Sequence, residues 1–312
     1  MTNLTAIAAA ETAASVSPTL WQQLWREKSA RRGLILIGLV LLAAIAAPLV
    51  AALLGHGETQ QFRDTALSDI GIPVGPGLDF PLGADDNGRD VLVRTLYGTR
   101  VSLMVAIPAT TLAMIIGTAI GLFSGFFAGA WDKVSEQCIN IVLSFPFIVT
   151  ALSLLTFNRN ASGENRVDPM WVVILIIAFF SWGYFARLTR GLVLNLKHQG
   201  FVEAAQVMGV SKRRIILREI LPNVLPTLAI YWAVQLPANI IAEATLSFLG
   251  VGIPAPHASL GNMIADVQRS AMYQVQPWFL AGPAFALFIS VLGFNSLSSG
   301  LRNVLDPHFR QR

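Results

Sequence analysis

The stretch GLILIGLVLLAAIAAPLVAALL, residues 33–54, runs for 22 positions without a charged side chain. A helix needs about 20 consecutive, mostly apolar residues to cross the hydrocarbon core of a bilayer. We therefore predict that this stretch spans a membrane. It lies too far from residue 1, and has no small-residue cleavage site after it, to be a removable signal peptide, so we expect it to remain as an anchor.

Five further charge-poor segments of comparable length follow along the chain. The six predicted spans are residues 33–54, 101–127, 138–157, 170–186, 225–250 and 278–297. The composition agrees, since charged residues make up only 13% of the chain, whereas soluble globular proteins have about 25%. Hydrophobic residues reach 54%, and the mean hydropathy is +0.59. The sequence predicts an all-α, polytopic membrane protein with six transmembrane helices.

Basic residues are distributed unevenly between the two sides that these spans define. If the N-terminus is cytoplasmic, 15 Lys and Arg residues fall in cytoplasmic segments and 7 fall outside. The positive-inside rule then places both termini in the cytoplasm, and it explains the basic composition without a nucleic-acid partner. We expect residues 1–32 to form a cytoplasmic tail with a short amphipathic approach helix, and residues 33–312 to form the transmembrane domain. Within that domain, 55–100 is an outer loop and 198–222 is a long, basic inner loop.

Small residues and prolines indicate how two of the spans pack. Four glycines recur every four residues and so share one helix face: Gly117, Gly121, Gly125 and Gly129. Such a face lets another backbone approach closely, so we expect a helix–helix contact, with a substrate-lining groove as the alternative. Pro108 and Pro146 lie inside spans, and each is expected to kink its helix.

A few polar residues lie deep in predicted spans. Glu243 is the only ionisable one, and an intramembrane carboxylate is a candidate functional residue. It either lines a transport path and meets the amino group of a substrate, or pairs with a basic or hydroxyl group on a neighbouring helix. The same two alternatives apply to the other candidate path residues, Gln235, Asn239 and Asn295.

The motifs of metal sites and catalysis are absent from the sequence. The single cysteine, Cys138, excludes an intramolecular disulfide, and we expect it to be a small core residue. Residues 85–90, DDNGRD, lack the twelve-residue loop and closing glutamate of a calcium site, so a turn is expected, with Asp90 capping a short helix to Gly98. No histidine has metal-ligand spacing, and no GxxxxGK[ST] motif for ATP occurs. We therefore expect no catalytic residue, metal or cofactor in this chain.

The inner loop is the most informative segment. Residues 203–211, EAAQVMGVS, predict a short helix, a glycine stop and a serine that caps a second helix. The second helix is basic on one side and apolar on the other, and it is expected to break at Pro222 and Pro226. The loop is either a basic connector at the membrane surface or a knob that docks into a partner, with the small alanines fitting a groove.

Residues 203–222 resemble the EAA loop of permeases of ATP-binding cassette (ABC) importers. The resemblance rests on Glu203-Ala204-Ala205, Gly209 and Leu221-Pro222, while Glu219 departs from the usual isoleucine. Other stretches resemble the dipeptide, oligopeptide and nickel branch, in particular the second of its paired permeases: PLGADDNGRDVL at 81–92, LSFP at 143–146, LSFLGVG at 246–252 and LRNVLDP at 301–307. Gln137, Asn140 and Ser298-Ser299 stand where relatives often carry charges.

The resemblance implies the type I importer permease fold in a bacterial inner membrane. It further implies a second homologous permease, two ATPase subunits that bind ATP and Mg²⁺, and an extracytoplasmic substrate-binding protein. The cargo would be dipeptides, oligopeptides or nickel chelates. The residues expected to couple to the ATPases are Glu203, Ala204, Ala205, Gly209, Leu221 and Pro222, with Gly209 at positive φ. A secondary transporter is the alternative, but it favours inverted repeats and several buried carboxylates, and neither is evident.

Overall fold

The computed structural model describes residues 20–158, 165–274 and 276–305, and the predicted tail at 1–19 lies outside them. Helices dominate this part of the chain, and its only β-pairing is two isolated bridges. The first helices are α2 (Leu20–Arg26), α3 (Lys28–Leu54), α4 (Arg63–Ala66), α5 (Val91–Phe127), α6 (Gly129–Ser144), α7 (Phe147–Phe157) and α8 (Pro169–Leu196). The rest are α9 (Gly200–Val207), α10 (Lys212–Arg214), the π-helix η1 (Ile215–Ile220), α11 (Leu221–Phe248), α12 (Leu260–Ser270), the 3₁₀ turn η2 (Met272–Gln274) and α13 (Trp278–Leu305).

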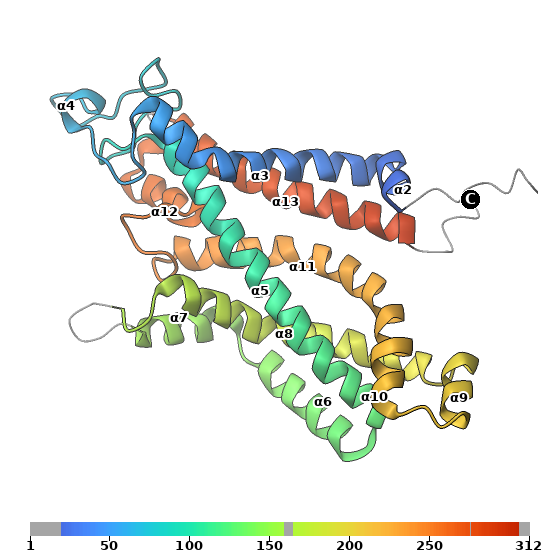
Figure 1. Cartoon of the computed structure of the whole chain (residues 1–312). Helices are drawn as coiled ribbons and strands as arrows, with labels where there is room; N and C mark the ends of the chain where they lie inside the picture. The colour runs from blue at the N-terminus through green and yellow to red at the C-terminus, as the bar shows by residue number, and fades with distance from the viewer. Residues whose placement is uncertain (1–19, 159–164, 275, 306–312) are drawn as a thin grey trace, which may run out of the picture.

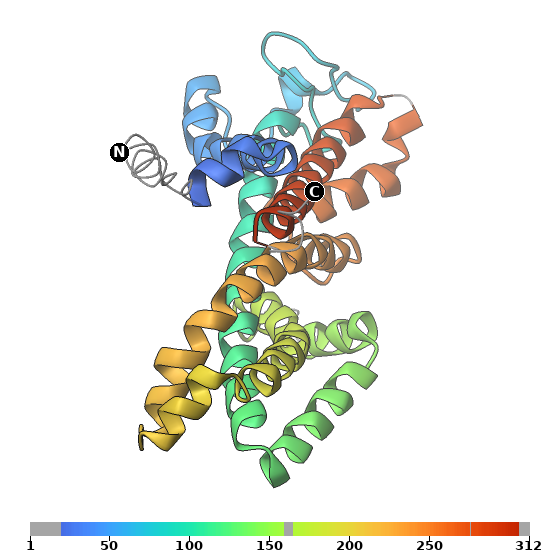
Figure 2. The same cartoon turned by 90° about the vertical axis from the view of Figure 1, so that its right-hand side faces the viewer.

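The bundle is elongated and has two distinct ends (Figure 1). One carries α4 and α12 and is here named the α12 end; the other carries α2, α9 and α10 and is named the α9 end. α3 lies alongside α13, and the long helix α5 runs diagonally between the two ends. Seen from the α9 end, α3 and α13 lie on one side of the molecule, and α6 and α7 lie on the other (Figure 2).

The lengths and compositions of the helices confirm most of the predicted spans. Five helical segments are long and apolar enough to cross a bilayer: Lys28–Leu54, Val91–Phe127, Pro169–Leu196, Lys212–Phe248 and Trp278–Val304. A sixth crossing results if α6 and α7 are taken as one broken span. α2 is the expected short helix ahead of α3, and Trp21 and Trp25 stack on its exposed surface with ring centroids 5.9 Å apart.

The third span is broken rather than kinked, which corrects the prediction for residues 138–157. α6 and α7 meet at 82°, with Phe145 and Pro146 both in extended conformation. The ring of Pro146 disfavours helical geometry at Phe145, so the helix ends there. At 1.5 Å per residue, α6 and α7 are about 24 and 16 Å long, and neither alone crosses a core of about 30 Å. Pro108, in contrast, lies inside an uninterrupted α5.

The second span begins ten residues earlier than predicted, at Val91 instead of residue 101. Asp90 caps α5 by accepting a hydrogen bond from the backbone N–H of Val93 at 3.1 Å. The predicted cap is therefore correct, but the helix it starts continues to Phe127 instead of ending at Gly98. The outer loop predicted at 55–100 is correspondingly shorter.

The expected break at Pro222 and Pro226 is wrong, because one continuous helical segment runs from Lys212 to Phe248. Pro222 lies in the first turn of α11, directly after the π-helical turn η1. A proline is tolerated in a first turn, since its missing N–H costs little there, and the π turn changes the hydrogen-bond register just before it. The part of the inner loop from Lys212 onward and the fifth span are thus one continuous helical segment, preceded by the separate helix α9.

The glycine face predicted on the second span packs against α8. A β-carbon on Gly121 would lie 2.6 Å from the carbonyl oxygen of Ala186, and Gly117 and Gly125 have similarly close α8 neighbours. The expected helix–helix contact is confirmed for these positions. Gly129 does not belong to it, because it starts α6 at φ +71° with open space around it.

Candidate coupling loop and polar interior

α9 and its termination form the tip of the α9 end. Val202 and Ala205 are buried, whereas Glu203 and Ala204 are exposed on the other side of the helix. Gly209 has φ +76°, and its N–H donates to the carbonyl of Gln206 at 3.0 Å. This confirms the predicted glycine stop, because the left-handed conformation strains any residue with a β-carbon.

The surface of this tip is unusually apolar for an exposed turn. Val207 is 89% exposed and Met208 is 74% exposed. Ser211 occupies the predicted N-cap position of α10, but its side chain makes no capping hydrogen bond. Leu221 and Pro222 lie on the first turn of α11, with Leu221 partly buried and Pro222 exposed. The predicted coupling residues thus fall on two helices of one helix–turn–helix and, for Gly209, on the turn between them.

Glu243 is fully buried and bonded by three serines from different parts of the chain. Its carboxylate accepts hydrogen bonds from the hydroxyls of Ser102 at 2.6 Å, Ser247 at 2.8 Å and Ser259 at 2.8 Å. Ser102 lies on α5, Ser247 on α11 and Ser259 at the N-cap of α12. A buried carboxylate requires such donors. The geometry is therefore that of the second alternative, bonding between helices through hydroxyl groups.

Asn239 makes a similar connection one turn earlier on α11. Its Nδ2 donates to Thr110 Oγ1 on α5 at 2.8 Å, and Ser181 Oγ on α8 donates to its Oδ1 at 3.2 Å. Gln235 is half-buried on the same helix. Asn295 is exposed on α13, a different helix. The structure therefore places Gln235, Asn239 and Glu243 on one helix and Asn295 on another.

Sequence reasoning missed the ion pair that holds α6. Arg190 on α8 donates to both carboxylate oxygens of Asp132, with Nη2 to Oδ2 at 2.8 Å, and Ser124 Oγ on α5 donates to Asp132 Oδ1 at 2.6 Å. Asp132 and Arg190 are 58 positions apart, so no helical periodicity connects them. Cys138, expected in the core, is instead exposed on α6, a helix with only Ile139 and Val142 buried.

The acidic cluster at the α12 end forms the predicted turn. Arg89 Nε donates to Asp85 Oδ2 at 2.6 Å, and the Nε of buried Arg94 lies 3.4 Å from the same oxygen. His56 Nδ1 is 2.7 Å from Asp90 Oδ2. Burial raises the pKa of the Asp86 carboxyl, and the charges of Asp85 and Asp266 raise it further. Among the described residues, no three His, Cys, Asp or Glu side chains are placed to hold a metal ion.

These features define a polytopic membrane protein with a helix–turn–helix knob at one end and, in its interior, hydrogen bonds between helices at Glu243 and Asn239. Residues 117–311 match the family described as binding-protein-dependent transport system inner membrane component. The chain belongs to this family and is a permease subunit of an ABC importer.

The similarity to known permeases covers nearly the whole chain. The oligopeptide transport system permease protein OppC of Haemophilus influenzae is 36% identical over 94% of this chain and 90% of its own length. The dipeptide transport system permease protein DppC of Alkalihalophilus pseudofirmus is 34% identical over 95% and 92%, and the glutathione transport system permease protein GsiD of Pectobacterium atrosepticum is 32% identical over 94% and 92%.

A solved structure supports the fold. The MetNI methionine ABC transporter, in an inward-facing conformation, matches 69% of this chain and 97% of its own with a TM-score of 0.51 and 20% identity. The predicted type I permease fold is thereby confirmed.

Proposed function

We propose that the chain is one of two homologous permeases of an ATP-driven importer of dipeptides or oligopeptides in a bacterial inner membrane. The substrate class is supported by the relatives, which are named for oligopeptides, dipeptides and glutathione, itself a tripeptide. Nickel chelates are the alternative cargo. Delivery by an extracytoplasmic binding protein agrees with the name of the family.

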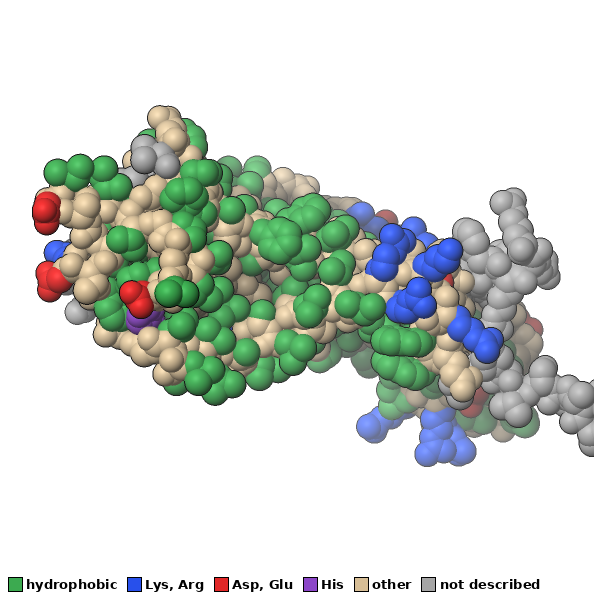
Figure 3. Space-filling model, turned by 90° about the horizontal axis from the view of Figure 1, so that it is seen from above, with side chains coloured by type: hydrophobic (Ala, Val, Ile, Leu, Met, Phe, Trp, Pro, Cys, Tyr) green, Lys and Arg blue, Asp and Glu red, His purple; other side chains and the backbone are tan. Residues whose placement is uncertain are grey.

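The charge distribution supports an orientation with the α9 end in the cytoplasm. In Figure 3 the visible basic side chains gather mainly at the α9 end, acidic side chains lie at the opposite end, and hydrophobic side chains occupy the middle. The positive-inside rule assigns the basic end to the cytoplasm. Both α2 and the described end of α13 lie at the α9 end, so the two termini would be cytoplasmic.

The knob at residues 203–209 is the single feature that best supports ATPase coupling. It combines an exposed carboxylate at Glu203 with the exposed apolar side chains of Val207 and Met208, held by the left-handed turn at Gly209. An exposed apolar tip of this kind indicates a partner surface. Two ATPase subunits, which bind ATP and Mg²⁺, would each receive one knob from one permease. This chain would supply no catalytic residue.

Closure of the ATPases would move the knob, and the rigid helices behind it would transmit the movement. α9 follows α8 after three residues, and η1 continues directly into α11. α8 packs on the glycine face of α5, and α11 is tied to α5 through Glu243 and Asn239. Gln235, Asn239, Glu243 and Asn295 stay candidate residues of the translocation path between the two permeases.

The experiment compares two glycine variants of the assembled importer, reconstituted in lipid with its binding protein. Gly209→Ala places a β-carbon in open space but in a left-handed conformation, whereas Gly200→Ala adds one in open space without positive φ. The strain is about 1 to 2 kcal/mol, roughly a five- to thirtyfold change in a docking equilibrium. We expect Gly209→Ala to lower the rate of peptide-stimulated ATP hydrolysis roughly five- to thirtyfold. We expect Gly200→Ala to leave that rate unchanged.

Co-purification provides the direct check on the assignment. The tagged wild-type chain is expected to bring down its ATPase subunits, and Glu203→Lys is expected to weaken that association. If no ATPase accompanies the wild-type chain, the proposed coupling role of the knob is wrong.

A further inference from the structure

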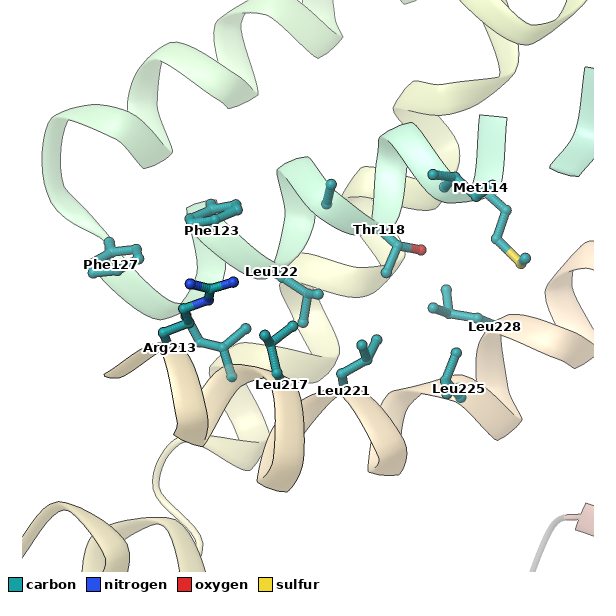
Figure 4. Close-up of a pocket in the computed structure, with 13 residues that line it drawn as sticks. Met114, Thr118, Leu122, Phe123, Phe127, Arg213, Leu217, Leu221, Leu225 and Leu228 are labelled. Atoms are coloured by element: carbon teal, nitrogen blue, oxygen red, sulfur yellow. The ribbon is translucent and has the colours of Figure 1, made fainter. Parts of the chain in front are cut away.

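A deep apolar groove lies between α5 and the η1–α11 segment, close to the α9 end (Figure 4). It has a volume of about 520 Å³. Leu217, Leu221, Leu225 and Leu228 form one wall, and α5 supplies the other through residues such as Leu122 and Phe123. Several of these side chains are open to the surroundings, with Phe123 59% and Leu217 and Leu225 each 48% exposed.

A single charged residue, Arg213, lies in the lining, at the end of the groove nearest the knob. Arg213 is exposed and forms no ion pair with any residue that the structure describes. Lys212 lies next to it in sequence, with its Nζ 5.7 Å from the ring centroid of Phe127, which also lines the groove. The groove thus has a basic mouth and an apolar body.

The dimensions of the groove fit one acyl chain. Arg213 and Leu228 are 15 positions apart on one continuous helical segment, which corresponds to about 22 Å at 1.5 Å per residue. One leaflet contributes about half of a hydrocarbon core of about 30 Å. A tilted groove of this length therefore holds a whole lipid tail, while the headgroup stays at the level of Arg213.

We propose that this groove binds an anionic phospholipid, with one acyl chain between α5 and α11 and the phosphate at Arg213 and Lys212. Charge complementarity determines the choice of occupant: a guanidinium that pairs with no described residue, at the mouth of an apolar groove in a membrane-spanning chain, matches a lipid phosphate. Arginine binds phosphate through paired N–H donors, and each basic residue near a surface attracts anionic lipid. The assignment depends on the membrane spans and not on the cargo.

The test measures which lipids the full-length chain retains. The chain is placed in nanodiscs made from equal amounts of dioleoyl phosphatidylglycerol and dioleoyl phosphatidylcholine, and the lipids that remain bound after release are identified by native mass spectrometry. We expect phosphatidylglycerol to be enriched about tenfold. Arg213→Ala is expected to abolish that enrichment.

A matched control comes from the neighbouring position. Arg214→Ala removes the same charge from an exposed residue that does not line the groove, and it is expected to preserve the enrichment. An equal loss in both variants would overturn the proposal in favour of diffuse surface attraction. Equal retention of the two lipids by the wild type would overturn it as well.

A second pair of variants tests the acyl chain separately from the headgroup. Leu217→Trp fills the groove while leaving Arg213 in place, and it is expected to reduce phosphatidylglycerol retention severalfold. Leu249→Trp, at a leucine of similar exposure outside the groove, is the control and is expected to have no effect. The assembled importer is measured in the same way, and loss of the bound lipid on assembly would show that a partner subunit occupies the groove instead.

Discussion

Arg190 on α8 forms a bidentate ion pair with Asp132 on α6, in which Nη2 donates to Oδ2 at 2.8 Å and Nε donates to Oδ1. Both side chains are mostly buried, with 26% and 16% of their surfaces exposed. Of the residues of α6, only Ile139 and Val142 are buried. The ion pair therefore adds to the small apolar contact that Ile139 and Val142 make with the core in holding this half of the broken span against α8.

Asp132→Asn is expected to loosen α6 while leaving the rest of the bundle folded. A hydrogen bond to a charged group contributes about 1.5 to 3 kcal/mol, so amide exchange in α6 should accelerate by roughly tenfold or more. Hydrogen–deuterium exchange with mass spectrometry measures this directly. Glu136→Gln is the control, since Glu136 is 53% exposed and 3.6 Å from Arg190; an equally large effect there would contradict the assignment.

Gly121→Ala is expected to lower the stability of the chain by about 1 to 3 kcal/mol, because the added carbon overpacks the contact. Its β-carbon would lie 2.6 Å from the Ala186 carbonyl oxygen on α8. Gly191→Ala, on α8 but with open space around it, should instead be neutral or stabilising by up to about 1 kcal/mol. Thermal unfolding in detergent compares the two, and similar melting temperatures would argue against a tight α5–α8 contact.

Glu243→Leu is expected to destabilise the chain strongly, since it leaves the hydroxyls of three serines without their acceptor. Each unsatisfied buried group costs about 1 to 3 kcal/mol. Glu243→Gln keeps one carbonyl acceptor, so it should lower the stability of the chain less than Glu243→Leu does. The measurement is the melting temperature alongside the transport rate per folded molecule. A stable Gln variant with a changed KM for peptide would show contact with substrate in place of a structural role.

Asp86→Asn is expected to stabilise the α12 end at neutral pH. Burial, with the neighbouring charges of Asp85 and Asp266, raises the pKa of the Asp86 carboxyl in the folded protein. A raised pKa means that the ionised form disfavours folding, so wild-type stability improves as pH falls through that pKa. The advantage of the variant should therefore shrink between neutral and acidic pH in thermal melts. The matched control is Asp79→Asn, at an exposed aspartate of the same segment; an equal gain of stability in that variant would contradict the role of burial at Asp86.

Five of the six spans, and their order, could be predicted because long apolar runs dominate membrane insertion. Their ends could not, because the sequence does not reveal whether a charged residue ends a helix or is accommodated inside it. Arg94 lies inside α5, where Nη1 donates to the carbonyls of Glu58 and Pro256 at 3.2 and 3.0 Å. Those partners are distant in sequence, so nothing local revealed that a charged residue is accommodated there.

In the polar interior, too, local features could be predicted from the sequence and contacts between distant segments could not. Glu243 was identified from its type and depth alone, and Ser247 could have been added, because residues four apart share a helix face. Ser102 and Ser259 could not, since they reach Glu243 only through the packing of α5 and α12. The helix and the glycine stop of the knob were predictable because both are local properties, whereas the side-chain cap expected of Ser211 does not form.

The length of α5 has a mechanical consequence. Its 37 residues extend for about 55 Å, well beyond a hydrocarbon core of about 30 Å. The hydrogen bonds of Asp90 and Arg94 hold its first turns at the α12 end. Its glycine face packs closely against α8 nearer the α9 end. A tilt of about 5° about one end displaces the opposite tip by roughly 5 Å, given that length. We therefore expect α5 to act as a lever arm, converting a small rotation at one membrane face into a displacement of several ångströms at the other.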